Sequence, residues 1–266
     1  MFIIFFIISF IASVIGVISG LGGGIIIKPV LDMSGLAVVS VASFMSGCTV
    51  LSMTTMNLAR SLSRPKDMLI DRTRSPFLAI GALGGGYLGN LIFDSLMTAV
   101  GVANQNIVGA IQAGILLLIT VSVMIYMAHK ANIKTRDVKN IFAALLIGLV
   151  LGILSAFLGI GGGPMNLVVL YYFFSMNSKE AAQNSLFIIF FSQLMSLSQT
   201  LLTGSVPLGL DLTNLTVMIV GGISGALLGG YFNKKLDEKK VDQLLMAVFT
   251  LIAIINVYNF VKFILF

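Results

Sequence analysis

The sequence GLGGGIIIKPVL at residues 20–31 returns in modified form as FLGIGGGPMNLVVL at residues 157–170. Each copy holds three successive glycines inside an otherwise apolar stretch. These glycines are Gly22, Gly23 and Gly24 in the first copy and Gly161, Gly162 and Gly163 in the second. Because glycine disfavours helix and tolerates unwound backbone, we expect a helix to break at both places.

The composition is that of a membrane protein. The chain has 266 residues, of which 58% are hydrophobic and 10% charged, and its mean hydropathy is +1.05. Soluble domains carry about 25% charged residues, so a soluble fold is excluded. The apolar runs lack the two-residue alternation of a transmembrane β-barrel. We predict an all-α polytopic protein of the cell membrane, whose first segment is retained because no signal-peptide cleavage pattern follows it.

Charge-free apolar stretches divide the chain into eight segments. They cover residues 2–27, 36–59, 75–93, 95–128, 141–176, 181–210, 212–233 and 243–261. The first and the fifth contain the glycine clusters. Since a membrane-spanning helix needs about 20 residues, the fifth segment is long enough to enter the membrane and return.

The two halves of the chain repeat one another, which predicts two units of four segments at residues 1–133 and 134–266. Equivalent residues are separated by 139 to 142 positions. Besides the glycine clusters, the pairs are Ser43 with Ser185, Asn57 with Gln199, Asp71 with Asp211, and Gly81, Gly85 and Gly89 with Gly221, Gly225 and Gly229. For the last six glycines, spaced four apart on one helix face, we expect close helix packing.

The loop charges predict that the two repeats are inverted. The loop after the second segment carries five cations, whereas the matching loop at residues 201–213 carries none. The five are Arg60, Arg64, Lys66, Arg72 and Arg74. Cytoplasmic loops are enriched in such residues, so each half crosses the membrane an odd number of times, with both termini outside the cytoplasm. The glycine-broken segments then form re-entrant hairpins; eight plain spans are the alternative.

The glycine breaks are also the expected binding site. Unwound backbone at membrane depth is tolerated only where it is buried or lines a cavity, and half-helix N-termini favour anions. The acidic residues all lie in loops or at segment ends, so the pattern favours a small anion over a cation. Lys28, four residues after the first cluster, is a candidate ligand, with an interfacial position near Asp32 as the alternative.

Uncharged polar side chains concentrate in the second and sixth segments, where hydroxyl and amide groups can donate hydrogen bonds to an oxyanion. The candidates there are the symmetric pairs Ser43 with Ser185 and Asn57 with Gln199, followed by Asn166 just after the second break. The structural alternative is hydrogen bonding to the backbone or to neighbouring helices.

Other function classes find little support. The single cysteine, Cys48, and the single histidine, His129, provide neither a metal-ligand cluster nor a catalytic dyad within the segments. The Lys and Arg residues lie in short loops, where they set the orientation of the protein in the membrane, so they do not indicate nucleic-acid binding. We therefore expect no enzyme activity, no cofactor and no nucleic-acid partner.

The two glycine-rich stretches, together with the A-x-x-x-S run at residues 181–185, resemble the paired signatures of the sulfite exporter TauE/SafE family, also called DUF81 or TSUP. The resemblance covers essentially the whole chain. Three positions depart from the family pattern: Pro164 directly after the glycines, Lys28 before Pro29, and Gln199 where many members have histidine.

The resemblance implies a secondary transporter in the lipid bilayer that moves small, typically sulfur-containing anions such as sulfite, thiosulfate, sulfonates or sulfoacetate, driven by a proton or membrane-potential gradient. Alternating access around a midplane site at the two breaks is the expected mechanism. An anion channel of the same architecture and a non-transporting membrane subunit of a sulfur-metabolism complex remain alternatives, and a homo-oligomer is left open.

Overall fold

The computed structural model describes residues 2–64, 68–101 and 104–265, so Lys66 falls outside it. The described chain forms helices and no strands. The first run comprises α1 (Phe2–Ser19), α2 (Gly24–Ser34), α3 (Val39–Leu62), α4 (Ser75–Val100) and α5 (Gln105–His129). After the short helix η3 (Lys130–Asn132), the second run comprises α6 (Ile141–Phe157), α7 (Pro164–Phe174), α8 (Ser178–Leu202), α9 (Leu212–Lys235) and α10 (Glu238–Leu265).

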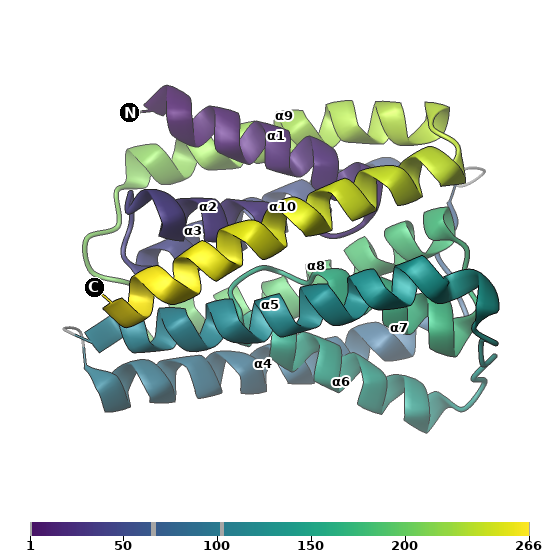
Figure 1. Ribbon diagram of the computed structural model, residues 1–266, viewed down its shortest axis with the longest axis horizontal. Helices are drawn as coiled ribbons and strands as arrows, with labels where there is room; N and C mark the ends of the chain where they lie inside the picture. The colour runs from purple at the N-terminus through teal and green to yellow at the C-terminus, as the bar shows by residue number, and fades with distance from the viewer. Residues whose placement is uncertain (1, 65–67, 102–103, 266) are drawn as a thin grey trace.

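Each run begins with a broken pair of helices and continues with three long ones (Figure 1). Seven of the described helices, α1, α3, α4, α5, α8, α9 and α10, are long and apolar enough to cross a membrane. Apolar side chains such as Leu118 and Ile254 point outward, 70% and 64% exposed, as on a lipid-facing surface. The prediction of an all-α membrane protein with a broken first segment in each half is confirmed.

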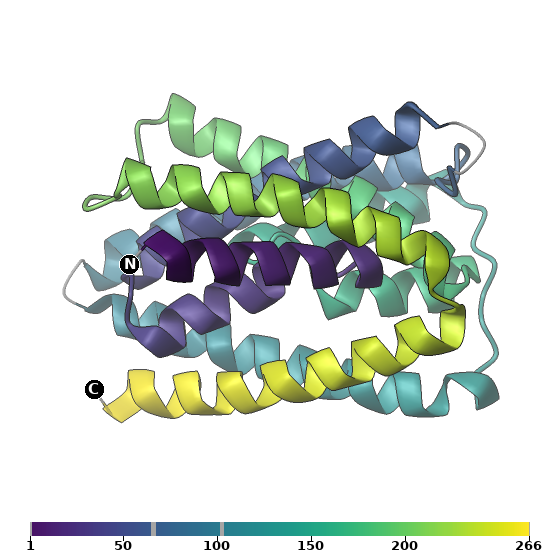
Figure 2. The ribbon, with the colours of Figure 1, turned by 90° about the horizontal axis from the view of Figure 1, so that it is seen from above.

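Both termini lie at one end of the helix bundle, and α5 carries the chain to the opposite end, where α6 begins (Figures 1 and 2). We call the first the terminal end. The second holds the connections α3–α4, α5–α6 and α9–α10. We call it the basic end, because these connections and the helix ends that flank them carry most of the described Lys and Arg residues.

The evenly spaced glycines allow helices of the two runs to pack closely against each other. A Cβ atom on Gly85 of α4 would lie 2.1 Å from the carbonyl oxygen of Leu149 in α6, and one on Gly225 of α9 would lie 2.4 Å from that of Phe10 in α1. Each glycine-lined helix therefore holds the broken element of the other run at backbone distance. The predicted packing role of these glycines is confirmed.

The turns before α4 and α9 are built alike. The Asp71 carboxylate accepts hydrogen bonds from the backbone N–H groups of Thr73 (2.8 Å) and Arg74 (3.2 Å), and Asp211 accepts them from Thr213 (2.8 Å) and its neighbour. Partial burial raises the pKa of Asp71, but the hydrogen bonds outweigh it, so the pKa lies below its usual value.

Several helix ends differ from the predicted segment boundaries, and two of these differences change how the chain is divided. The third and fourth segments do not separate at Asp94, because nothing there breaks a helix and α4 continues to Val100, where Gly101 ends it at φ 73°. The sixth segment ends at Leu202 rather than Leu210 because Gly204, at φ 67°, turns the chain. Asp94 consequently lies within a helix, and the expectation that acidic residues are confined to loops and segment ends is wrong there.

Candidate functional site

The glycine-rich breaks adopt backbone conformations that other residues rarely reach. Gly20 and Gly22 have φ of 75°, and their equivalents Gly159 and Gly161 have φ of 63° and 69°. In the second break the next two glycines also have positive φ, 125° and 145°. Only glycine takes up such angles without strain, which explains why the helices stop here.

The two breaks touch each other at the centre of the protein. A Cβ atom on Gly24 would lie 2.1 Å from the carbonyl oxygen of Ile160, and one on Gly22 would lie 3.4 Å from that of Gly161. Backbone thus packs on backbone between the two halves. The structure brings together the two glycine clusters that the sequence singled out.

A small apolar cluster lies beside the breaks. This central cluster consists of Val17, Val50, Met53, Leu186, Ile189 and Ala226. Val50 and Ile189 are fully buried. A Cβ atom on Gly161 would lie 2.4 Å from Val50 Cγ1, and one on Gly162 would lie 2.3 Å from Ile189 Cγ1. The breaks therefore rest directly against the cluster.

The predicted serine pair occupies equivalent places. Ser185 Oγ donates a 2.6 Å hydrogen bond to the carbonyl oxygen of Gly20. Ser43 lies against Gly159, where a Cβ atom would be 2.7 Å from its Oγ, and that buried hydroxyl has no partner among the described residues. Each serine thus faces the break of the opposite half.

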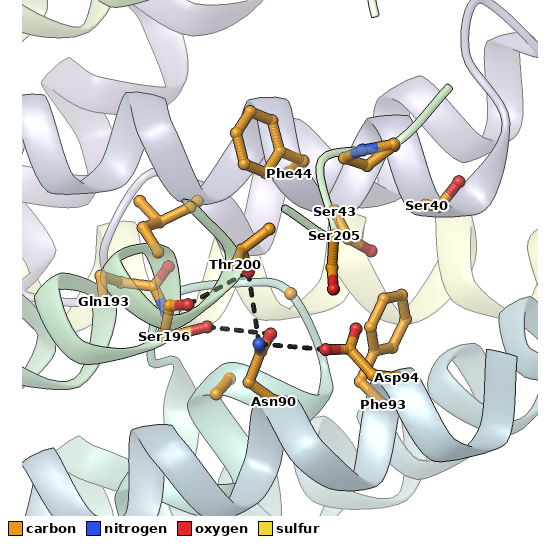
Figure 3. A pocket seen from close by; sticks show the side chains of 15 residues that line it. Ser40, Ser43, Phe44, Asn90, Phe93, Asp94, Gln193, Ser196, Thr200 and Ser205 are labelled. Atoms are coloured by element: carbon orange, nitrogen blue, oxygen red, sulfur yellow. Dashed lines mark hydrogen bonds between the residues drawn. The ribbon is translucent and has the colours of Figure 1, made fainter. Parts of the chain in front are cut away.

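A pocket of about 50 Å³ opens toward the terminal end (Figure 3). We call it the terminal-end pocket; its lining includes Ser43, Asn90, Asp94, Gln193, Ser196 and Thr200. Asn90 Nδ2 donates to Thr200 Oγ1 at 3.2 Å and to Asp94 Oδ2 at 3.4 Å, and Asn90 Oδ1 accepts from Ser196 at 3.3 Å. A wider cavity of about 560 Å³ adjoins this pocket and shares Ser40, Asp94, Ser205 and Pro207 with it.

A second pocket of about 50 Å³ lies at the basic end, between α1, α3, α8 and α9. This basic-end pocket is lined by Val17, Asn57, Arg60, Ser61, Arg64, Gln183, Leu186, Gly230, Asn233 and Lys234. Val17 and Leu186 also belong to the central cluster, so the cluster bounds this pocket on its inner side.

The two pockets are equivalent by the internal repeat. Five lining positions of one correspond to lining positions of the other at offsets of 139 to 142. The pairs are Val17 with Ala156, Leu186 with Phe44, Gly230 with Asn90, Asn233 with Phe93, and Lys234 with Asp94. The protein therefore presents one such pocket at each of its two ends, with the breaks and the central cluster between them.

The remaining sequence candidates lie apart from one another. Asn57 lines the basic-end pocket, whereas its repeat mate Gln199 is buried next to Thr200 and lines neither pocket. Asn166 lines a small cavity of about 10 Å³ beside Gly162, and its buried Nδ2 has no partner in the described chain.

Lys28 also lies outside both pockets. It is buried in α2 and pairs with Asp32 at 2.5 Å. From α10, Asn259 donates to the carbonyl oxygen of Pro29 at 2.9 Å and Lys262 donates to that of Asp32 at 2.9 Å. These contacts tie the half-helix α2 to α10.

Sequence reasoning missed several residues of these sites. Gly20 and Gly159 share the left-handed conformation of the breaks, and their alignment at offset 139 is the signal that could have found them. In the sequence, Arg60 contributes only to the orientation signal, and no pattern indicates Asn90. Pocket residues come from helices of both halves, and no local pattern shows that juxtaposition.

Comparison with known proteins agrees with this architecture. The family described as Sulfite exporter TauE/SafE matches residues 5–256. The chain is 25% identical over 278 residues to the "Probable membrane transporter protein YunE" of Bacillus subtilis (strain 168), covering 97% of this chain and 98% of that protein. No solved structure gives a significant match. With its seven apolar helices the protein is a multi-pass membrane protein, and it belongs to the sulfite exporter TauE/SafE family of membrane transporters.

Proposed function

We propose that the protein is a secondary transporter, and not an enzyme, that carries small anions through the membrane by alternating access. Sulfur oxyanions and sulfonates, such as sulfite, thiosulfate and sulfoacetate, are the proposed substrates. The observation that carries the proposal is the pair of repeat-equivalent pockets at opposite ends, separated by the glycine breaks and the central cluster. In that arrangement the anion passes between the pockets at the breaks.

The proposal includes an inverted repeat, with residues 1–133 and 134–266 as its halves. Its support is the common element order, the position of both termini at one end (Figure 2) and the position of the two pockets at opposite ends. Short cytoplasmic loops are enriched in Lys and Arg, so the basic end is the cytoplasmic one and both termini lie outside. Exchange of conformations between inverted halves is a general route to alternating access.

Hydrogen-bond donors favour an anion at both pockets. Amide and hydroxyl groups line each of them, and the unwound backbone of the breaks lies between the two pockets. We propose a proton gradient as the driving force, because Asp94 places a titratable group in the lining of the terminal-end pocket. A bound anion beside this carboxylate is most stable when the carboxylate is protonated.

Counterflow in proteoliposomes tests the proposal. Vesicles loaded with unlabelled thiosulfate are diluted into labelled sulfite or thiosulfate, with and without a pH gradient. We expect saturable accumulation of label above its external concentration, faster when the gradient is present. A panel of unlabelled sulfonates and carboxylates inside the vesicles ranks the substrates.

Two results would contradict a carrier. Anion conductance without counterflow would identify a channel of the same architecture. Protein that is folded but moves no anion, and co-purifies with a partner, would point to a non-transporting subunit. Vesicles without protein control for leak. Vesicles whose pH gradient has been dissipated with an ionophore control for the effect of the gradient.

A further inference from the structure

The two pockets are equivalent in position but opposite in charge. The terminal-end pocket includes Asp94, and the equivalent position in the basic-end pocket is Lys234. Arg60 and Arg64 add two further cations to the basic-end pocket, and their equivalents are Leu202 and Val206. The lining of the basic-end pocket contains no carboxylate among the described residues. A small anion therefore meets an attractive field in this pocket.

The Arg60 guanidinium is held in place by backbone. Its Nη1 donates a 2.8 Å hydrogen bond to the carbonyl oxygen of Leu227. It lies over Gly230, where a Cβ atom would be only 2.6 Å from the same nitrogen. The equivalent of Gly230 in the other pocket is Asn90, so the absence of a side chain makes room for the guanidinium on this side only.

The guanidinium keeps donors for a ligand. It has five N–H groups in a rigid fork, a geometry that matches oxyanions, and the described residues place no carboxylate in ion-pair contact with Arg60 or Arg64. Asn57, one helical turn before Arg60, and Ser61 beside it add neutral donors to the lining.

The size of the pocket limits the ligand. A volume of about 50 Å³ corresponds to about three to five water molecules at about 10–15 Å³ each. Such a space fits a sulfate-sized group. Val17 and Leu186 close it toward the central cluster.

We infer that the basic-end pocket is a binding site for small oxyanions, in which Arg60 is the principal charged donor. The site lies apart from the glycine breaks and is the first to receive an anion that arrives from the basic end. The inference rests on the proposed function for its place in transport, although binding itself can be measured without transport. An anionic lipid headgroup carries the same phosphate oxygens and is the competing ligand.

Binding is tested with the full chain in nanodiscs of phosphatidylcholine alone. Sulfate is added stepwise, sodium gluconate keeps the ionic strength constant, and the thermal unfolding of the protein is measured at each sulfate concentration. We expect saturable stabilisation of the wild type, an apparent Kd about tenfold to a hundredfold higher in Arg60→Gln, and a smaller loss in Arg60→Lys. Lys139→Gln, which removes an exposed cation from the same end outside the pocket, keeps the wild-type affinity.

Unfolding without sulfate shows whether each variant folds. Equal sulfate affinity in Arg60→Gln and the wild type would overturn the inference. So would stabilisation by phosphatidylglycerol in the nanodisc that depends on Arg60 while sulfate has no effect, because the ligand would then be a lipid.

Counterflow separates the two proposals. If the wild type exchanges anions and Arg60→Gln has an unchanged KM for an anion supplied at the basic end, only this inference fails. Arg60-dependent sulfate binding without any exchange would instead remove the proposed function alone.

Discussion

Alanine at Gly161 lowers anion exchange by at least about a hundredfold, whereas alanine at Gly204 leaves it unchanged. Both glycines have nearly the same φ, 69° and 67°, so both substitutions carry the same left-handed backbone strain of about 1–2 kcal/mol. Only at Gly161 does the new Cβ atom collide, 2.4 Å from Val50 Cγ1, whereas nothing lies within 4 Å of it at Gly204. The difference between the variants therefore isolates the packing of the second break.

A double mutant tests the cause. Val50→Ala removes the Cγ atoms that a Cβ on Gly161 would strike, so Gly161→Ala combined with Val50→Ala recovers part of the exchange. Initial rates of counterflow, normalised to folded protein, are compared for Gly161→Ala, Val50→Ala, their combination and Gly204→Ala. Normal exchange by Gly161→Ala would show that the second break takes no part in transport, and equal losses in Gly161→Ala and Gly204→Ala would show that strain alone is responsible.

Alanine at Ile189 lowers the free energy of unfolding by about 2–5 kcal/mol and opens an anion leak between the pockets. The Ile189 side chain is fully buried and lies against both breaks, 3.2 Å from a Cβ atom placed on Gly22 and 2.3 Å from one on Gly162. Removing it leaves a cavity in the central cluster, and cavities of this kind cost that much in protein cores. The same cavity gives water a path beside the breaks.

Ile254→Ala is the matched control, because that side chain is 64% exposed on the lipid-facing side of α10 and its truncation leaves no internal cavity. Thermal unfolding in detergent measures stability, and efflux of trapped anion in the absence of exchangeable substrate measures the leak. Equal unfolding temperatures and equally tight vesicles for both variants would show that the central cluster seals nothing.

Much of the architecture could be predicted from the sequence because its causes are local. Long apolar runs dictate membrane helices, and the glycine clusters dictate breaks, since only glycine adopts the conformations at Gly161 and Gly162 without strain. The repeat offset also paired Ser43 with Ser185, and each of them faces the break of the opposite half, because equivalent residues of equivalent helices face equivalent partners. Their role in anion binding stays a prediction.

The pockets could not be predicted because their residues meet only in the folded protein. Asn57 lines a pocket while Gln199, its repeat mate, lines neither of the two. Lys28 lies near a break in sequence, but Asp32 lies beside it one helical turn later, and the two side chains form an ion pair. The position of the Arg60 guanidinium in the pocket depends on Gly230, which lies 170 residues away in sequence and leaves room for it.

The most direct measurement is the accessibility of one cysteine in each pocket. With Cys48 replaced by serine, Ser43→Cys reports on the terminal-end pocket and Ser61→Cys on the basic-end pocket. An impermeant maleimide is applied to right-side-out and inside-out vesicles, with and without saturating substrate. Alternating access predicts that substrate raises the labelling rate at one cysteine and lowers it at the other. A change of both rates in the same direction, or of one rate alone, would contradict it.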